Sequence, residues 1–136
     1  MTSVLIIDDE EDIRIVLKEI FVRAGFDVAV ASDGNEGLNL LRENGADLVI
    51  TDIIMPGSDG VEIAYEIRCE FPKTKIIVMS GGGNIAPLDY EPAAIATSAY
   101  LASAAAVGAD MTITKPFDRE ELLNAARNLT AKQTHG

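Results

Sequence analysis

The stretch "SVLIIDDEEDIR", residues 3–14, joins a short apolar run to five consecutive acidic residues. The apolar run is rich in β-branched residues and predicts a buried strand over residues 3–7. The acidic residues that follow have two explanations. They open a helix, whose N-terminus carries a partial positive charge that acidic side chains complement, or they form a group of carboxylates that binds a cation.

Four further strands are predicted along the chain, with helical segments between them. Apolar runs occupy residues 27–31, 47–51 and 75–79, and a weaker run occupies residues 111–114. The first three of these runs lack a strict alternation of polar and apolar residues, which is typical of strands that are covered on both faces. The alternation of strands and helices favours an α/β fold, in which right-handed crossovers join parallel strands.

Amphipathic segments predict where the helices lie. Three stripes of apolar residues have helical spacing: Ile13, Leu17, Ile20 and Ala24; Ile63, Ile67 and Phe71; and Leu122, Ala126 and Leu129. Gly25 ends the first of these helices. Asp33, Asp59 and Asp118 each stand three residues before a glutamate, a spacing that resembles a capping box at a helix start.

Composition and charge indicate a single domain and exclude several kinds of partner. The 136 residues are 48% apolar, and their formal net charge is −11. This is enough chain for one core, and the negative field disfavours direct binding to nucleic acid or to a membrane. The single cysteine, Cys69, excludes an internal disulfide, and no secretory signal is visible. We expect a cytoplasmic domain over residues 1–131, a frayed tail at residues 132–136 and no output domain.

Reactive side chains follow the predicted strands directly. Asp8 and Asp9 come after the first strand and Asp52 after the third, while Ser80 follows the fourth and Lys115 the fifth. Ligands of an open parallel α/β sheet bind outside the carboxyl ends of its strands. If the strand order is 2-1-3-4-5, the first and third strands are neighbours and their acids converge.

Three carboxylates at one edge of a sheet cannot all stay ionised without a compensating charge. Mg²⁺ suits such a site, because it binds a few carboxylate oxygens and keeps water molecules and a phosphate oxygen as its other ligands. Lys115 adds a positive charge and Ser80 adds a hydroxyl. Among these groups the Asp52 carboxylate is equipped to attack phosphorus, and the product is an aspartyl phosphate.

Four segments of the chain resemble the marker segments of a known family. They are "VLIIDDEEDIR" (4–14), "DLVITDIIMPGSDG" (47–60), "IIVMSGGG" (76–83) and "ITKPF" (113–117). Together and in this order they resemble the response regulator receiver domains of two-component signalling. The resemblance implies a flavodoxin-like, doubly wound sheet of five parallel strands in the order 2-1-3-4-5, with helices on both faces.

The resemblance also implies a role for each site residue. Asp52 matches the phosphoacceptor, Ser80 the hydroxyl that contacts the phosphoryl group, and Lys115 the lysine that pairs with it. The implied magnesium site consists of Asp9, Asp52, the main-chain carbonyl of Ile54 and Asp8, which orients metal-bound waters. The implied phosphoryl donor is a sensor histidine kinase or a histidine phosphotransfer protein, and the signal passes to an unidentified downstream protein.

Two departures from the family pattern bear on the switch mechanism. Thr112 stands where the family usually has an aromatic residue. An extended segment, about 81–92, lengthens the connection after the fourth strand. Our hypothesis is that phosphorylation reshapes this segment instead of moving an aromatic ring. The remaining acids, residues 10–12, are assigned to the first helical turn, where they complement the helix dipole.

Three alternatives compete with a stand-alone receiver that acts as a switch. A phosphohydrolase with an aspartate nucleophile normally has a second acid two residues later, where this chain has Ile54. A degenerate receiver acts only as a protein-binding module, but the acids and the lysine of the site are all present. A flavin carrier is disfavoured, because "DDEED" repels the flavin phosphate. We therefore predict a phosphoacceptor switch and not a turnover enzyme.

Overall fold

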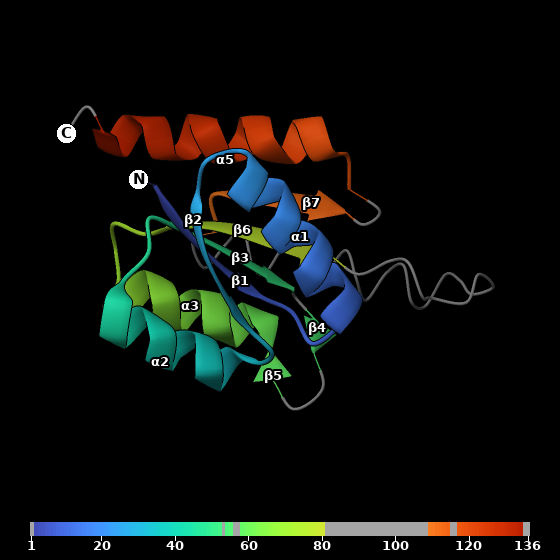
Figure 1. Cartoon of the computed structure of the whole chain (residues 1–136). Helices are drawn as coiled ribbons and strands as arrows, with labels where there is room; N and C mark the ends of the chain where they lie inside the picture. The colour runs from blue at the N-terminus through green and yellow to red at the C-terminus, as the bar shows by residue number, and fades with distance from the viewer. Residues whose placement is uncertain (1, 53, 56–57, 81–108, 115–116, 135–136) are drawn as a thin grey trace.

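The fold is a five-stranded parallel sheet between two layers of helices (Figure 1). The computed structural model describes residues 2–52, 54–55, 58–80, 109–114 and 117–134. The strands of the sheet are β1 (Ser3–Ile7), β2 (Asp27–Ala31), β3 (Leu48–Asp52), β6 (Lys75–Ser80) and β7 (Met111–Thr114). Their order is β2-β1-β3-β6-β7, which confirms the predicted order 2-1-3-4-5. A short antiparallel pair, β4 (Ile54–Met55) and β5 (Ser58–Asp59), follows β3.

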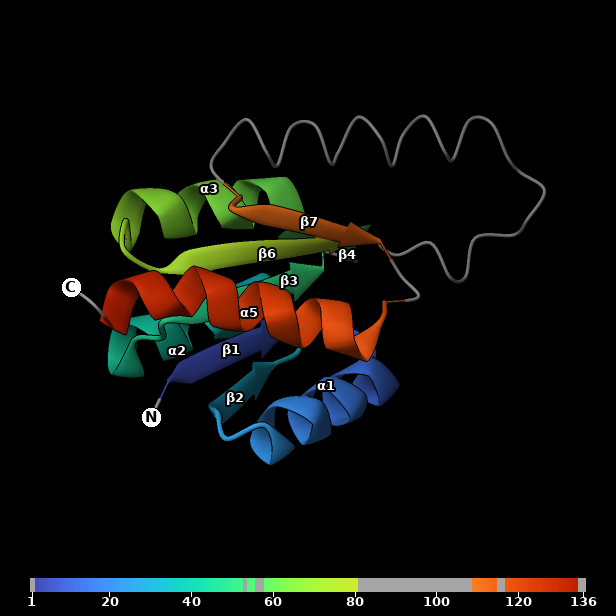
Figure 2. The ribbon, with the colours of Figure 1, turned by 90° about the horizontal axis from the view of Figure 1, so that it is seen from above.

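Helices cover both faces of the sheet. Helices α1 (Glu11–Arg23) and α5 (Arg119–Thr134) lie on one face, and α2 (Gly34–Asn44) and α3 (Gly60–Glu70) lie on the other (Figures 1 and 2). Alternate residues of β1 point to opposite faces, because side chains alternate along a strand. Val4 and Ile6 belong to the core beneath α1 and α5, whereas Leu5 and Ile7 belong to the core beneath α2 and α3.

The helix ends follow the predicted chemistry where side chains are described. The Glu36 N–H donates to Asp33 Oδ1 at 2.8 Å, and the Glu121 N–H donates to Asp118 Oδ2 at 2.9 Å. Each bond satisfies an N–H group that has no partner within its own helix. Gly25, with φ +94°, follows α1 directly after its C-cap. The side chain of Asp59 lies outside the described residues.

The strand predictions fail in two details. The third and fourth strands end at Asp52 and Ser80, each one residue later than predicted. Strand β2 lies at the edge of the sheet, and its alternating burial shows that it is not covered on both faces. Its Asp27 and Ala29 are exposed, and both line a cleft of ≈ 510 Å³ between this strand and the last turn of α2.

The C-terminal helix is longer than predicted. Helix α5 continues to Thr134, beyond residue 131, and the frayed tail expected at residues 132–136 stays a prediction. Lysine and glutamine, at 132 and 133, are good helix formers. The buried Thr130 also donates its hydroxyl to the carbonyl of Ala126 at 2.8 Å, within the same helix. The extended segment predicted at residues 81–92 lies outside the described residues.

Candidate functional site

The register of the sheet brings the carboxyl ends of β1 and β3 to the same level. Ile7 of β1 pairs with Thr51 of β3. The residues that follow them, Asp8 and Asp52, therefore lie side by side. On the other side of β3, Asp52 pairs with Met79 of β6. Ser80 then pairs with Thr114, the last residue of β7. The register of the strands therefore places Asp8, Asp52 and Ser80 at one edge of the sheet.

Three carboxylates meet at this edge. One oxygen from each of Asp8, Glu10 and Asp52 lies within 4.8 Å of the others. Asp8 and Asp52 are only 1% and 4% exposed, whereas Asp9 is exposed and is not a member of this group. The predicted convergence of the acids after the first and third strands is therefore confirmed for Asp8 and Asp52, with Glu10 as the third carboxylate.

Glu10 corrects the prediction that it belongs to the first helical turn. It is the N-cap residue of α1, with an extended backbone at φ −93° and ψ 118°, and its side chain makes no capping bond. The Glu10 N–H donates to Asp8 Oδ1 at 2.9 Å. This bond closes a tight turn, and the Glu10 side chain lies beside the carboxylates of Asp8 and Asp52. Glu11 and Asp12 do lie in the first turn of α1, where the helix dipole accounts for them. The signal in the sequence was the Asp-x-Glu spacing across the turn after a strand.

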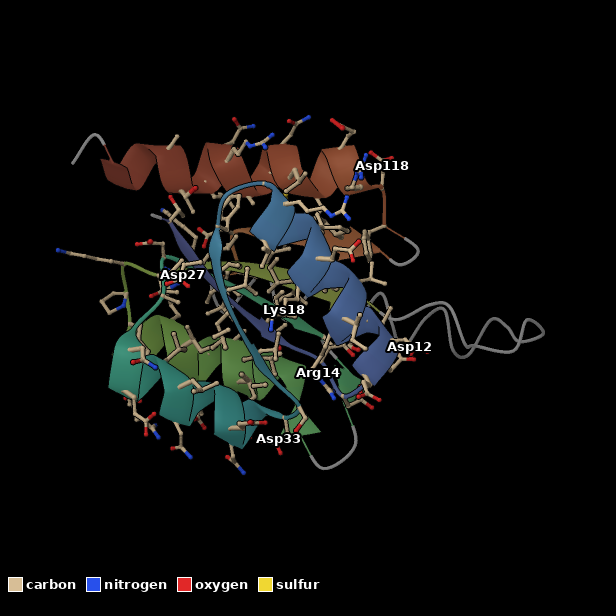
Figure 3. All side chains as sticks on the ribbon, in the orientation of Figure 1. Asp12, Arg14, Lys18, Asp27, Asp33 and Asp118 are labelled. Atoms are coloured by element: carbon tan, nitrogen blue, oxygen red, sulfur yellow. The ribbon has the colours of Figure 1, made fainter. Side chains whose placement is uncertain are left out.

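Arg14 is a second residue of the site that the sequence did not reveal. Its Nη1 donates to the main-chain carbonyl of Asp8 at 2.8 Å. The Asp8 N–H donates in turn to the carbonyl of Ala31, at the end of β2, at 3.1 Å. Figure 3 shows Arg14 at the start of α1, beside the ends of the strands. The acidic turn is thus held by bonds from two other elements.

The donor set fits a hard divalent cation. Carboxylate oxygens are the ligands that Mg²⁺ prefers, and two buried carboxylates beside a third repel one another unless a positive charge lies near them. The Ser80 side chain, the Ile54 side chain and Lys115 lie outside the described residues, so the structure tests neither their contacts nor their roles. Thr112 is exposed on the edge strand β7.

Comparisons with known proteins identify the family. The model of the response regulator receiver domain matches residues 4–91, and the chain belongs to this family. The fold and the acidic edge of the sheet agree with this assignment. Receiver domains are the phosphoacceptor switches of two-component response regulators, and they are phosphorylated on an aspartate.

Solved structures of receiver domains resemble the whole chain. The receiver domain of NtrX from Brucella abortus is 30% identical, with a TM-score of 0.78, over 94% of this chain and 98% of that one. The chemotaxis protein CheY4 of Vibrio cholerae is 27% identical, with a TM-score of 0.74, over 95% of this chain and 98% of that one. NtrX from Brucella abortus in complex with ADP is 28% identical, with a TM-score of 0.81, and this chain covers 28% of its length.

Among the described residues, no helix is both long enough and apolar enough to cross a bilayer.

Proposed function

We propose that this chain accepts a phosphoryl group on Asp52 from a sensor histidine kinase or a histidine phosphotransfer protein, in a reaction that requires Mg²⁺. The observation that carries the proposal is the burial of Asp52 at the end of β3, with carboxylate oxygens of Asp8 and Glu10 within 4.8 Å. A buried carboxylate in acidic company needs a cation. A cation at that place also serves the transfer of a phosphoryl group to the same carboxylate.

Each residue of the site has a chemical task in this proposal. Asp8 and Asp52, together with Asp9 and the main-chain carbonyl of Ile54, would hold the metal, and the Glu10 carboxylate lies beside Asp8 and Asp52. When bound, Mg²⁺ neutralises charge that develops on the oxygens of the transferring group. An oxygen of Asp52 forms the new bond to phosphorus, while the bond from phosphorus to the donor's imidazole nitrogen breaks. Ser80 and Lys115 contact the oxygens of the phosphoryl group.

The product is a switch that relays its state by a change of conformation. We propose that the receiver assists both its own phosphorylation and the later hydrolysis of the aspartyl phosphate. Signal output passes to an unidentified downstream protein. A cytoplasmic location remains a prediction from the sequence.

Incubation with acetyl phosphate and Mg²⁺, followed by intact mass measurement, tests the proposal. We expect the addition of one phosphoryl group, which disappears in Asp52→Asn or when a chelator removes the metal. Asp27→Asn is the matched control, because Asp27 is exposed at the opposite end of the sheet (Figure 3); it should take up phosphate as the wild type does.

The same experiment separates the proposal from its two rivals. Steady turnover of a phosphate ester without a stable adduct indicates a phosphohydrolase. A folded protein that takes up no phosphoryl group indicates a receiver that acts only as a protein-binding module. Undiminished uptake in Asp52→Asn would refute the assignment of the phosphoacceptor.

A further inference from the structure

Asp8 is held from three directions. Its N–H donates to the Ala31 carbonyl at 3.1 Å, and its carboxylate accepts the Glu10 N–H at 2.9 Å. Its carbonyl accepts the third bond, from the Arg14 guanidinium at 2.8 Å. Of these three partners, Arg14 is the only one that acts through its side chain, so it is the one that a substitution can remove.

The bond from Arg14 closes a loop between the strand and the helix. The Arg14 N–H donates to the carbonyl of Glu10, the N-cap of α1, at 3.1 Å, while its side chain reaches back to the end of β1. Both ends of the acidic turn are therefore bonded to the same residue. Asp12, in the same helical turn, is exposed, and Figure 3 shows it on the outer side of α1, away from this contact.

The peptide after Asp8 orients the turn that aims the Glu10 N–H at the Asp8 carboxylate, at 2.9 Å. If this peptide rotated, that hydrogen bond would be lost, and the buried carboxylate could move relative to those of Asp52 and Glu10, whose oxygens now lie within 4.8 Å of it. Mg²⁺ tolerates little displacement, because it demands nearly octahedral ligands at about 2.0–2.1 Å. Groups that only orient the ligands of a metal commonly change its affinity by about 10- to 100-fold.

We propose that Arg14 is a positioning residue of the cation site and that its hydrogen bond to Asp8 strengthens the binding of Mg²⁺. The inference rests on the proposed function, since it concerns the same metal site. In this proposal the positively charged Arg14 favours the binding of another cation, Mg²⁺. The charge of Arg14 alone has the opposite effect, because a positive group near the site repels Mg²⁺.

The sign of the change in affinity therefore distinguishes positioning from simple electrostatics. Removing the guanidinium weakens Mg²⁺ binding if orientation dominates, and it strengthens binding if charge repulsion dominates. Arg14→Met is the most direct variant, since methionine keeps most of the aliphatic stem and loses the charge and the donor. Arg14→Lys keeps the charge and one donor group and should recover part of the affinity.

The measurement is the dissociation constant of Mg²⁺ by calorimetric titration of the whole chain without any phosphoryl donor. We expect Arg14→Met to raise it by about tenfold and Arg14→Lys to raise it less. Arg23→Ala is the matched control: Arg23 is an exposed residue of the last turn of α1, and its Nε lies 3.7 Å from Glu19 Oε1, far from the carboxylates along the helix. This variant should bind Mg²⁺ as the wild type does.

Unchanged or tighter binding by Arg14→Met would overturn the inference. If that variant fails to fold, which thermal unfolding reveals, Arg14→Lys decides alone: weaker binding than the wild type supports positioning, and equal binding refutes it. The proposed function fails separately. A wild-type chain that binds no Mg²⁺ contradicts the metal site itself, whereas a wild type that binds Mg²⁺ beside an unaffected Arg14→Met contradicts only the role of Arg14.

Discussion

Arg68 on α3 and Asp110, the residue before β7, form an ion pair in which Nη2 lies 2.6 Å from Oδ2. The same Asp110 oxygen accepts the Ile76 N–H at 2.8 Å, and the Asp110 N–H donates to the Ile76 carbonyl at 2.8 Å. Arg68 also donates to the Pro72 carbonyl at 2.9 Å. These bonds join α3, β6 and the start of β7 at the end of the sheet opposite the carboxylates.

Replacing Asp110 should destabilise the fold. Asp110→Ala removes the acceptor of both the Ile76 N–H and Arg68, and hydrogen bonds to charged groups contribute about 1.5–3 kcal/mol each. Because both side chains are about a quarter exposed, at 26% and 24%, we expect a loss of about 2 kcal/mol in total. Urea unfolding measures it, with Asp27→Ala as the matched variant at an exposed strand start. Equal stability of the two variants would contradict this role.

Gly37 allows α2 to approach β1. A Cβ at this position would lie 2.8 Å from Cγ1 of Ile7 and would also overlap its Cδ1. Overpacking of this kind costs about 1–3 kcal/mol, whereas replacing a helical glycine by alanine gains about 1 kcal/mol. We expect Gly37→Ala to lower the free energy of unfolding by about 1 kcal/mol net.

A double-mutant cycle with Ile7→Val identifies the cause of that loss. Valine lacks the Cδ1 atom that the new methyl group would overlap. Gly37→Ala should therefore be less harmful in the Ile7→Val background than in the wild type. An identical cost in both backgrounds would show that the contact with Ile7 is not responsible.

Arg42 of α2 and Glu70 of α3 make a paired contact on the surface, at 2.7 Å and 2.9 Å. The hydrogen bond from Arg42 lowers the pKa of Glu70 below its ordinary value. A carboxylate whose pKa is lower in the folded state stabilises the fold above its unfolded pKa, about 4.3, and this contribution disappears as the pH falls through the folded pKa.

The pH dependence of a substitution tests this pair. The stability difference between the wild type and Glu70→Gln should be constant near neutral pH and should shrink below about pH 4. It should also shrink at high salt, because the pair is exposed to solvent. Urea unfolding across this pH range measures the difference. A difference that does not depend on pH would mean that the ion pair contributes nothing to stability.

The sheet and the position of its acids were predictable from local patterns. Apolar runs of five or six residues that end at Asp8 and Asp52 place both carboxylates at the ends of buried strands. The order of the strands came from the family resemblance, since periodicity does not say which strands are neighbours. The exposure of β2 was missed because its run of apolar residues was interpreted by composition alone, although the implied strand order already placed this strand at the edge of the sheet.

The correction for Glu10 and the missed contact of Arg14 both depend on geometry finer than sequence spacing. Glu10 was assigned to the helix because acids favour the first turn of any helix. The helix begins one residue later, at Glu11, so Glu10 is the N-cap and its side chain lies beside Asp8. Arg14 gave no signal, because an arginine on an amphipathic helix is usually a solvated residue. Only the turn after β1 brings its guanidinium to the Asp8 carbonyl.

The central claim, that Asp52 is the residue that carries the phosphoryl group, is tested most directly by reductive trapping. Borohydride converts an aspartyl phosphate to homoserine, and peptide mass spectrometry then locates the changed residue. After treatment with acetyl phosphate and Mg²⁺, we predict homoserine at position 52 and unchanged aspartates at positions 8 and 9. Homoserine at another position, or none at 52 in a protein that has gained phosphate, would contradict the account.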